Sequence, residues 1–126
     1  MEMSKKLGLI LYWAEGDKSQ DYFVALTNTS PEILKYFSVW LRKYFIIDEN
    51  KLRCRLYIWS NLDEIKAKNF WSKQLKVPIN QFTKSYISKT IPKVRKIRHL
   101  YGVCRLSYGS KKIFNEIDEG IRKHFY

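Results

Sequence analysis

Hydrophobic and polar side chains alternate most regularly over residues 52–60, which have the sequence LRCRLYIWS. The side chains that point to one side are apolar: Leu52, Cys54, Leu56 and Ile58. Those that point to the other side are basic or aromatic: Arg53, Arg55, Tyr57 and Trp59. A period of two with one apolar side predicts a strand that buries a single face. Because guanidinium groups and aromatic rings suit phosphates and bases, we predict that the other face binds nucleic acid.

Four other segments repeat apolar side chains at helical spacing, which predicts helices. They cover residues 4–15, 31–45, 62–76 and 111–121. Ser30 and Ser110 are expected N-caps, because a hydroxyl oxygen can accept a hydrogen bond from a free backbone N–H. Asn61 and Glu64 have the spacing of a capping box for the third helix. Gly16 is expected to end the first helix, because glycine adopts the left-handed conformation without strain.

Three further segments are rich in residues that favour strands: 22–27, 81–90 and 101–109. The predicted order is helix, strand, helix, strand, helix, strand, strand, helix, with a basic connector at 91–100. This order predicts an α+β fold in which helices cover one face of a largely antiparallel sheet. The opposite face is then basic and aromatic, which suits the major groove of DNA. No linker or repeat divides the chain, so we expect one domain over residues 1–126.

The charge of the chain is strongly positive and unevenly distributed. The formal net charge is +12, from 24 Lys and Arg against 12 Asp and Glu. Residues 65–115 contain thirteen of these basic residues and no acidic one. Because repulsion of this size destabilises a fold unless a polyanion offsets it, the distribution favours a nucleic-acid partner. A basic surface that serves solubility alone is the other explanation of the same composition.

Other features of the sequence argue against several classes of protein. No apolar run is long enough to cross a membrane, and the first residues lack the pattern of a secretory signal. We therefore expect an intracellular protein, of the cytoplasm or nucleoid, that does not bind membranes. Cys54 and Cys104 lie in predicted strands without neighbouring metal ligands, which favours buried apolar positions. His99 and His124 are far apart in sequence and are expected at the surface.

Residues 8–16, with the sequence GLILYWAEG, resemble the signature helix of the LAGLIDADG homing endonucleases. The segment keeps a leucine, an alanine, a final acid and the closing glycine, at Leu11, Ala14, Glu15 and Gly16. It departs at Ile10, where the pattern has a small residue, and at Trp13, where it has a first carboxylate. Its final acid is a glutamate, whereas the family has an aspartate. The order of elements and the basic charge extend the resemblance, in outline, over most of the chain.

The resemblance to this family implies a LAGLIDADG-like domain that works as a two-fold homodimer on double-stranded DNA. The dimer would form through the first helix, at Gly8, Leu11, Tyr12 and Ala14, and would bind a pseudo-palindromic target. The two Glu15 carboxylates, with the Gly16 carbonyl nearby, would bind Mg²⁺ as oxygen ligands. The implied function is a site-specific DNA endonuclease that hydrolyses phosphodiester bonds with this metal.

Cleavage of a phosphodiester also needs a cation near the transition state. Lys84 and Lys89 lie on predicted strands of the acid-free segment, as does Arg105, and the two lysines are expected to act with Glu15. Most of the other basic residues are expected to hold the nucleic-acid backbone. The predicted nucleic-acid-binding residues are Arg53, Arg55, Tyr57, Trp59, Lys84, Lys89, Lys93, Arg95, Lys96, Arg98 and Arg105.

Two other functions fit the same residues. The missing first carboxylate at Trp13 and the glutamate at Glu15 favour a domain of LAGLIDADG descent that binds DNA, or RNA as a splicing accessory, without cutting it. The aromatic rings of a basic sheet can also stack single-stranded bases, as in an unrelated RNA-binding protein. Two Glu15 carboxylates close together across a two-fold axis would favour the nuclease, and an exposed Glu15 on a monomer would favour the binding domain.

Overall fold

A computed structural model describes residues 4–89 and 100–126 of the chain. The helices are α1 (Lys5–Glu15), α2 (Pro31–Tyr44), α3 (Glu64–Leu75) and α4 (Lys111–Phe125). The strands are β1 (Val24–Asn28), β2 (Leu52–Trp59), β3 (Tyr86–Ser88) and β4 (Val103–Tyr108). Two short 3₁₀ helices, η1 (Glu49–Lys51) and η2 (Ile79–Gln81), precede β2 and β3. The predicted order of helices and strands is confirmed.

The four strands form one mixed sheet in the order β1-β4-β2-β3. β4 pairs antiparallel with β1 on one side and with β2 on the other. β2 and β3 run parallel, so the sheet is mixed, although it is largely antiparallel as predicted. The connection from β2 to β3 passes through α3, which returns the chain to the end of the sheet where β2 began. β3 is also much shorter than the predicted strand at 81–90.

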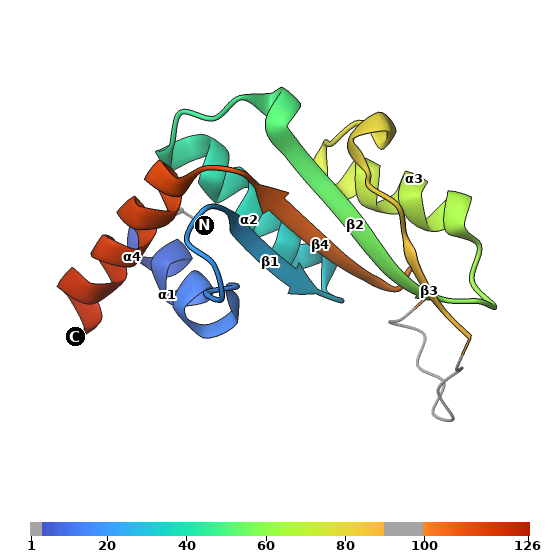
Figure 1. Cartoon of the computed structure of the whole chain (residues 1–126), viewed down its shortest axis with the longest axis horizontal. Helices are drawn as coiled ribbons and strands as arrows, with labels where there is room; N and C mark the ends of the chain where they lie inside the picture. Colours follow the sequence, from blue (N-terminus) through green and yellow to red (C-terminus); the bar gives the residue numbers. More distant parts are fainter. Residues whose placement is uncertain (1–3, 90–99) are drawn as a thin grey trace.

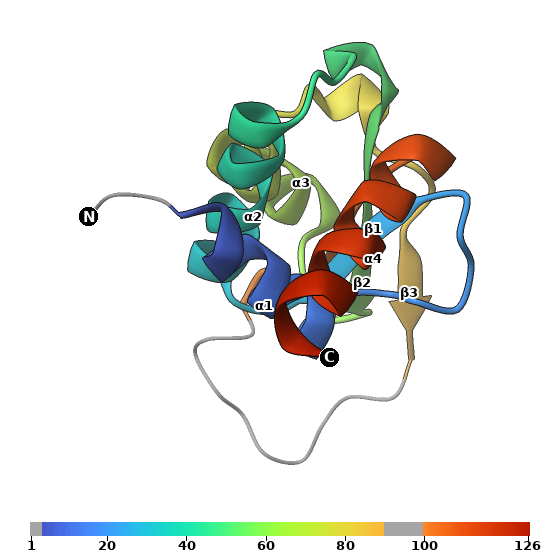
Figure 2. The ribbon, with the colours of Figure 1, turned by 90° about the vertical axis from the view of Figure 1, so that its left-hand side faces the viewer.

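The helices pack on the face of the sheet that carries Cys54, Leu56 and Ile58, and these side chains belong to one core cluster with residues of all four helices. Figure 2 shows α2 and α3 together on one side of the sheet. In Figure 1, α1 and α4 lie at the β1 edge of the sheet, and α3 lies at the β2–β3 edge. The free thiols of Cys54 and Cys104 are buried, which confirms their predicted apolar role.

The opposite face of the sheet, called the outer face below, is open. Burial along β2 alternates residue by residue from Leu52 to Trp59, as the period of two predicted. The outer face is formed by Arg53, Arg55, Tyr57 and Trp59 of β2, Val103, Arg105 and Ser107 of β4, Thr27 of β1, and Tyr86 and Ser88 of β3. The fold therefore turns the predicted basic and aromatic side chains away from the core.

Two of the three predicted helix caps are confirmed. The hydroxyl oxygens of Ser30 and Ser110 accept hydrogen bonds from the backbone N–H groups of Ile33 and Ile113. The cap of α3 is Asp63, whose carboxylate accepts from the N–H of Lys66, and not Asn61. Asn61 lies inside a turn that is closed by a hydrogen bond from the Leu62 N–H to the Trp59 carbonyl, so the helix begins later.

Gly16 ends α1, but for a different reason than predicted. Its backbone is extended, with φ −72° and ψ 154°, and is not left-handed. Gly16 forms a β-bridge with Leu26 at the edge of β1. A Cβ atom at Gly16 would lie 2.5 Å from the ring of Tyr12, so glycine is needed here for close approach. This bridge brings the end of α1 next to the sheet.

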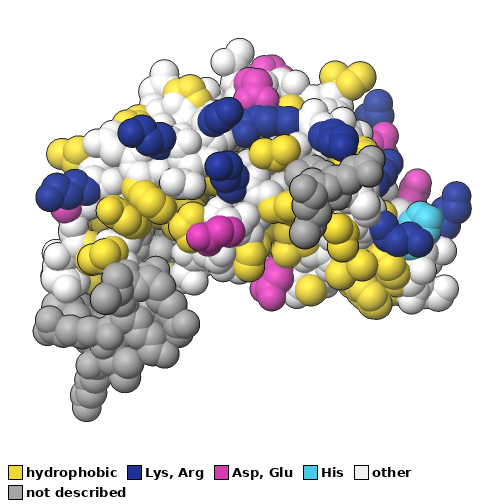
Figure 3. Space-filling view, turned by 180° about the vertical axis from the view of Figure 1, so that it is seen from behind, with side chains coloured by type: hydrophobic (Ala, Val, Ile, Leu, Met, Phe, Trp, Pro, Cys, Tyr) yellow, Lys and Arg dark blue, Asp and Glu magenta, His cyan; other side chains and the backbone are white. Residues whose placement is uncertain are grey.

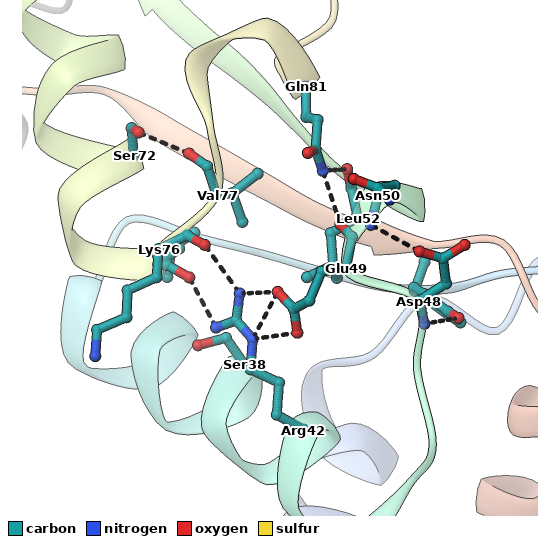
Figure 4. A network of polar contacts seen from close by, with 12 residues as sticks. Ser38, Arg42, Asp48, Glu49, Asn50, Leu52, Ser72, Lys76, Val77 and Gln81 are labelled. Atoms are coloured by element: carbon teal, nitrogen blue, oxygen red, sulfur yellow. Dashed lines mark hydrogen bonds and ion pairs between the residues drawn. The ribbon is translucent and has the colours of Figure 1, made fainter.

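A polar network fastens α2 to α3 (Figure 4). The Arg42 guanidinium pairs with the Glu49 carboxylate at 3.0 Å. It also donates to the carbonyls of Leu75 and Lys76, at 2.8 and 3.0 Å, where α3 ends. The Gln81 side-chain amide donates to the carbonyls of Glu49 and Leu52. These groups satisfy one another, so we assign the network a structural role.

Candidate nucleic-acid interface

Arginines on neighbouring strands lie side by side on the outer face. Arg55 of β2 is directly opposite Arg105 of β4, and Arg53 is directly opposite Ser107. The Cβ atoms of such a pair are about 5 Å apart, and like charges at this spacing destabilise a sheet. Neither Arg53 nor Arg55 forms an ion pair with an acidic side chain of the described residues. The face therefore concentrates positive charge where an anion can offset it.

Local contacts fix the directions of these guanidinium groups. Arg53 donates to the carbonyls of Asn50 and Leu52, at 2.6 and 2.8 Å. The Arg55 guanidinium lies 5.5 Å from the ring centre of Tyr57. Each guanidinium keeps further N–H groups that can donate to a phosphate. The outer face thus presents positioned donors.

Arg105 differs from its neighbours because it has an acidic partner. Its guanidinium pairs with the Asp17 carboxylate at 3.0 Å and lies 5.2 Å from the ring centre of Phe23. The pKa of Asp17 is lowered, first by the hydrogen bond from the Ser19 hydroxyl and further by the Ser19 N–H and Arg105. Asp17 thus stays ionised and offsets part of the charge at this end of the face.

Aromatic rings gather at the other end of β2. Tyr57 is opposite Tyr86 of β3, and the two ring centres are 6.2 Å apart. Tyr86 is 56% exposed, so most of its ring can contact a ligand. Trp59 is half-buried on the same side of β2. The outer face therefore has a basic centre with an aromatic end, which is the combination the sequence predicted for β2.

The basic residues of the acid-free segment do not share one face. Lys66, Lys68 and Lys73 are on α3, in the helix layer, where Lys68 pairs with Glu64. On this side of the molecule, Lys and Arg side chains are spread singly, with some acidic side chains among them (Figure 3). Of the predicted binding residues, Lys93, Arg95, Lys96 and Arg98 lie outside the described residues, as does His99. The described basic centre of the outer face comes mainly from β2.

The predicted catalytic residues are not brought together in one chain. Glu15 is exposed at the end of α1, which is bridged to β1. Lys84 and Lys89 are exposed on either side of β3, at the opposite edge of the sheet, and neither lies in a strand. Three strand spacings separate β1 from β3, which is about 14 Å. Of the candidate cations, Arg105 of β4 is on the strand next to β1.

The Gly16 carbonyl, one of the two predicted magnesium ligands, already binds a cationic side chain of the same chain. The Gly16 carbonyl accepts a hydrogen bond from the Lys18 ammonium at 2.9 Å. The same ammonium binds the carbonyls of Tyr12 and Trp13, at 3.4 and 3.0 Å, and so compensates the negative end of the α1 dipole. A second cation at the Gly16 oxygen would be repelled by this ammonium. In residues 4–89 and 100–126, no three His, Cys, Asp or Glu side chains form a metal-binding group.

Two of the four predicted dimer residues are used inside the chain. A Cβ atom at Gly8 would lie 2.0 Å from the indole of Trp40, so this glycine admits a neighbouring side chain of α2. Tyr12 is 1% exposed, and its ring packs against Phe37 and Phe114. The prediction that Gly8 and Tyr12 face a partner is therefore wrong, because α2 and α4 already cover them.

Tyr12 joins α1 to the first strand. Its hydroxyl donates to the Asp17 carbonyl at 2.5 Å and accepts from the buried Ala25 N–H at 3.2 Å. Burial raises the pKa of Tyr12 to about 12, although the Ala25 N–H opposes this shift. The phenol is thus neutral and fixes the start of the 16–23 loop.

The exposed side of α1 carries other apolar residues. Leu7, Ile10 and Trp13 are 45%, 42% and 40% exposed, and Ala14 is exposed as well. Leu11, from the predicted set, is half-buried. Trp13 stacks on Phe125 of α4 at 5.1 Å between ring centres. Figure 3 shows hydrophobic side chains gathered at the end of the molecule where α1 and α4 lie.

A cavity of about 430 Å³ opens on the outer face near β1. It is lined by Tyr22, Phe23, Lys51, Arg53, Arg105, Ser107 and Gly109. Tyr22, Phe23 and Lys51 were not among the predicted binding residues. The sequence placed Tyr22 and Phe23 at the start of a strand, whereas β1 begins at Val24. Their position over the sheet depends on the path of the 16–23 loop, which no local pattern indicated.

Comparisons of the chain with family models, with curated proteins and with solved structures found no match. The resemblance of residues 8–16 to the LAGLIDADG helix therefore stays a prediction. No helix in the described part of the chain is both long and apolar enough to span a bilayer.

Proposed function

We propose that the chain binds double-stranded nucleic acid, DNA in the first place, through the outer face of its sheet. The observation that carries the proposal is that Arg53 and Arg55 are exposed on an open face and have no acidic partner among the described side chains, whereas Asp17 compensates only Arg105. Uncompensated like charges on one face are unfavourable for the isolated fold. They are favourable when a polyanion lies against them, because phosphate contacts release condensed counterions.

The dimensions of the outer face suit a duplex. Arg53 and Trp59 are six residues apart on β2, which is about 20 Å along an extended strand. β2 and β4 are the two central, antiparallel strands of the four-stranded sheet, and a pair of strands matches the major groove, which is about 12 Å wide. The arginines would contact phosphates and the exposed ring of Tyr86 would contact bases or sugars. A single-stranded RNA that stacks on Tyr57 and Tyr86 is the competing ligand.

The proposal includes a homodimer, but its interface is a different side of α1 from the one predicted. The exposed residues Leu7, Ile10 and Ala14 lie one helical turn apart on α1, on the side that the core leaves uncovered. A second copy that packs there would bury this apolar stripe and double the number of phosphate contacts. The predicted endonuclease would need such a pair, because one chain supplies only one Glu15. Magnesium-dependent cleavage stays a prediction, and no step of it is derived from these residues.

The test is the salt dependence of duplex binding in two matched variants. Arg55→Gln removes a charge from the outer face, and Arg122→Gln makes the same change on the exposed end of α4. We expect Arg55→Gln to weaken the affinity for a labelled 20-base-pair duplex about tenfold. It should also reduce the slope of log affinity against log salt by about one. Fluorescence anisotropy at several salt concentrations measures both quantities.

The control decides how this result is interpreted. Arg122→Gln should leave the affinity and the salt slope close to the wild-type values, because Arg122 is paired with Asp118 away from the sheet. Equal losses in both variants would show that only the net charge matters and would reject the outer face as the interface. A wild-type affinity that does not change with salt would reject nucleic-acid binding altogether. Tighter binding to a single-stranded RNA of the same length would favour the competing ligand.

A further inference from the structure

The cavity near β1 is bordered by a loop that is anchored at both ends. The loop from Gly16 to Phe23 is anchored at Asp17, whose N–H donates to the Ala25 carbonyl at 2.9 Å and whose carbonyl accepts from the Tyr12 hydroxyl. The Ser19 N–H donates to the Asp17 carboxylate at 2.8 Å. These contacts anchor the start of the loop, and at its end the ring of Phe23 lies 5.2 Å from the Arg105 guanidinium. Both ends of the loop are thus attached to the sheet.

The aromatic wall of the cavity has one ring available for stacking. The ring of Phe23 is half-buried and is covered by the Arg105 guanidinium. Tyr22 meets Phe23 edge to face, with ring centres 5.1 Å apart, and is 58% exposed. A planar ligand can stack on the open face of Tyr22, as nucleic-acid bases do on exposed aromatic side chains.

The opposite wall is cationic. Lys51 and Arg53 line it, and the Arg53 guanidinium is held by the carbonyls of Asn50 and Leu52. The Lys51 ammonium lies 5.2 Å from the ring centre of Tyr108. Among the residues that the structure describes, no carboxylate lines the cavity, and the nearby Asp17 is already paired with Arg105. This wall suits an anion such as a phosphate.

A ring on one wall and cations on the other suit a ligand that has both a base and a phosphate. An inorganic phosphate would leave Tyr22 unused, and a nucleoside would leave Lys51 and Arg53 unused. The space of about 430 Å³ is wide open to solvent, which leaves room for a ligand that is part of a longer nucleic-acid chain. A base inside a duplex cannot use the ring of Tyr22, since its neighbours in the stack cover both of its faces. The fitting ligand is an unpaired nucleotide.

We propose that this cavity binds one unpaired nucleotide of a nucleic acid that lies on the outer face. This inference rests on the proposed function, because Arg53 and Arg105 belong to both the cavity and the interface. Its base stacks on Tyr22, and its phosphate lies between Lys51 and Arg53. The domain therefore prefers a duplex with a single-stranded end or an extruded nucleotide over an uninterrupted duplex.

The experiment compares two DNA hairpins whose strands are joined by a non-nucleotide linker, so that neither has unpaired loop bases, and that differ only in a three-nucleotide overhang. Fluorescence anisotropy gives the affinity for each hairpin, and 2-aminopurine in the overhang reports stacking by loss of its emission. We expect the wild type to bind the overhang hairpin about tenfold more tightly, the size of one base-stacking contact. Tyr22→Ala should remove this preference and leave the affinity for the blunt hairpin unchanged.

Two control variants separate the cavity from the rest of the face. Tyr22→Phe keeps the ring and should keep the preference. Tyr86→Ala removes an exposed ring at the other end of the face and should weaken binding to both hairpins equally. Circular dichroism checks that each variant is folded, which we expect because both tyrosines are exposed.

The outcomes that overturn the inference differ from those that overturn the proposed function. Equal wild-type affinities for the two hairpins would reject the nucleotide cavity and leave duplex binding in place. An overhang preference that survives in Tyr22→Ala would also reject it. If neither hairpin binds at any salt concentration, the proposed function fails, and the cavity proposal fails with it.

Discussion

The outer face of β2 and the helix α1 were both predicted to face a partner, but the chain uses them differently. On β2, Arg53 and Arg55 are exposed on the predicted side. On α1, Gly8 and Tyr12 are buried against α2 and α4. A strand has only two faces, so an alternating pattern assigns every side chain to one of them. A helix presents side chains all round its axis, so its neighbours decide which residues are covered.

The sharpest test of this difference is Gly8→Ala. Alanine is intrinsically better than glycine within a helix by about 1 kcal/mol. In this fold its Cβ would lie 2.0 Å from the Trp40 indole, which is fully buried and donates to the Lys5 carbonyl. We expect a net loss of about 2–3 kcal/mol in the free energy of unfolding. Urea denaturation followed by circular dichroism measures it.

Two companion variants make the Gly8 result specific. Gly109→Ala should cost little, because a Cβ at Gly109 meets no atom within 4 Å. Ile10→Glu, on the exposed side of α1, should leave the stability nearly unchanged and reduce association in light scattering. A Gly8→Ala variant that is stable but monomeric would contradict the intramolecular role of Gly8. It would mean that Gly8 contacts a second copy of the chain.

Much of the fold was predictable because local patterns determine it. The alternation of apolar and polar residues along β2 predicted which side of the strand is buried. The N-cap hydroxyls of Ser30 and Ser110 predicted where α2 and α4 begin. The parallel pairing of β3 was not predictable, since it depends on the path of the chain through α3. Long-range pairing of a three-residue strand leaves almost no local signal.

The candidate site was predictable only where it lies on one strand. The alternation of apolar and polar residues along β2 predicted that its arginines share the outer face. Arg105 was predicted from its position in the last strand. The cavity residues Tyr22 and Lys51 were missed, because the 16–23 loop brings them together from distant parts of the chain. The Lys18 ammonium on the Gly16 carbonyl was missed for a related reason, since the motif alone suggested a metal there.

A second prediction concerns the hydroxyl of Tyr12, which ties α1 to the sheet. Tyr12→Phe leaves the buried Ala25 N–H without its acceptor, so we expect a loss of about 1 kcal/mol at pH 7. Because burial raises the pKa of Tyr12 to about 12, the neutral phenol stabilises the folded state. That contribution is complete below pH 10 and is lost as the pH rises from 10 towards 12. The difference between the two proteins should therefore shrink above pH 10.

Urea denaturation at pH 7, 9 and 11 measures the Tyr12→Phe effect. Tyr22→Phe is a suitable control, because it makes the same chemical change at an exposed ring. A Tyr12→Phe variant whose deficit grows above pH 10 would contradict the buried role of this side chain. It would place Tyr12 on an accessible side of α1, as the dimer prediction required.

The smallest expected effect is at Asp17, where α1 and the outer face meet. Asp17→Asn removes the acidic partner that Arg105 has within the described residues and keeps an oxygen that can accept from Ser19. We expect the affinity for a duplex to rise about threefold and the salt slope to become steeper, because the freed guanidinium can contact a phosphate. Anisotropy titrations at two salt concentrations measure this change. An unchanged or weaker affinity would mean that Arg105 is not part of the interface.

Asp17→Asn should also lower the free energy of unfolding, which can be measured separately from the affinity. Because the pKa of Asp17 is lowered in the folded state, its charge stabilises the fold above the carboxyl pKa of the unfolded chain, about 4. The wild type loses this contribution as the pH falls through the pKa that Asp17 has in the folded state. The free energy of unfolding of Asp17→Asn should not show this part of the decrease in acid. The Arg105 and Asp17 side chains are only 25% and 23% exposed, so we expect a loss of about 1 kcal/mol and a variant that remains folded at pH 7. A gain in affinity with this loss of stability would show that the ion pair stabilises the fold and competes with the ligand for Arg105. The ion pair would then couple the stability of the fold to the affinity of the outer face.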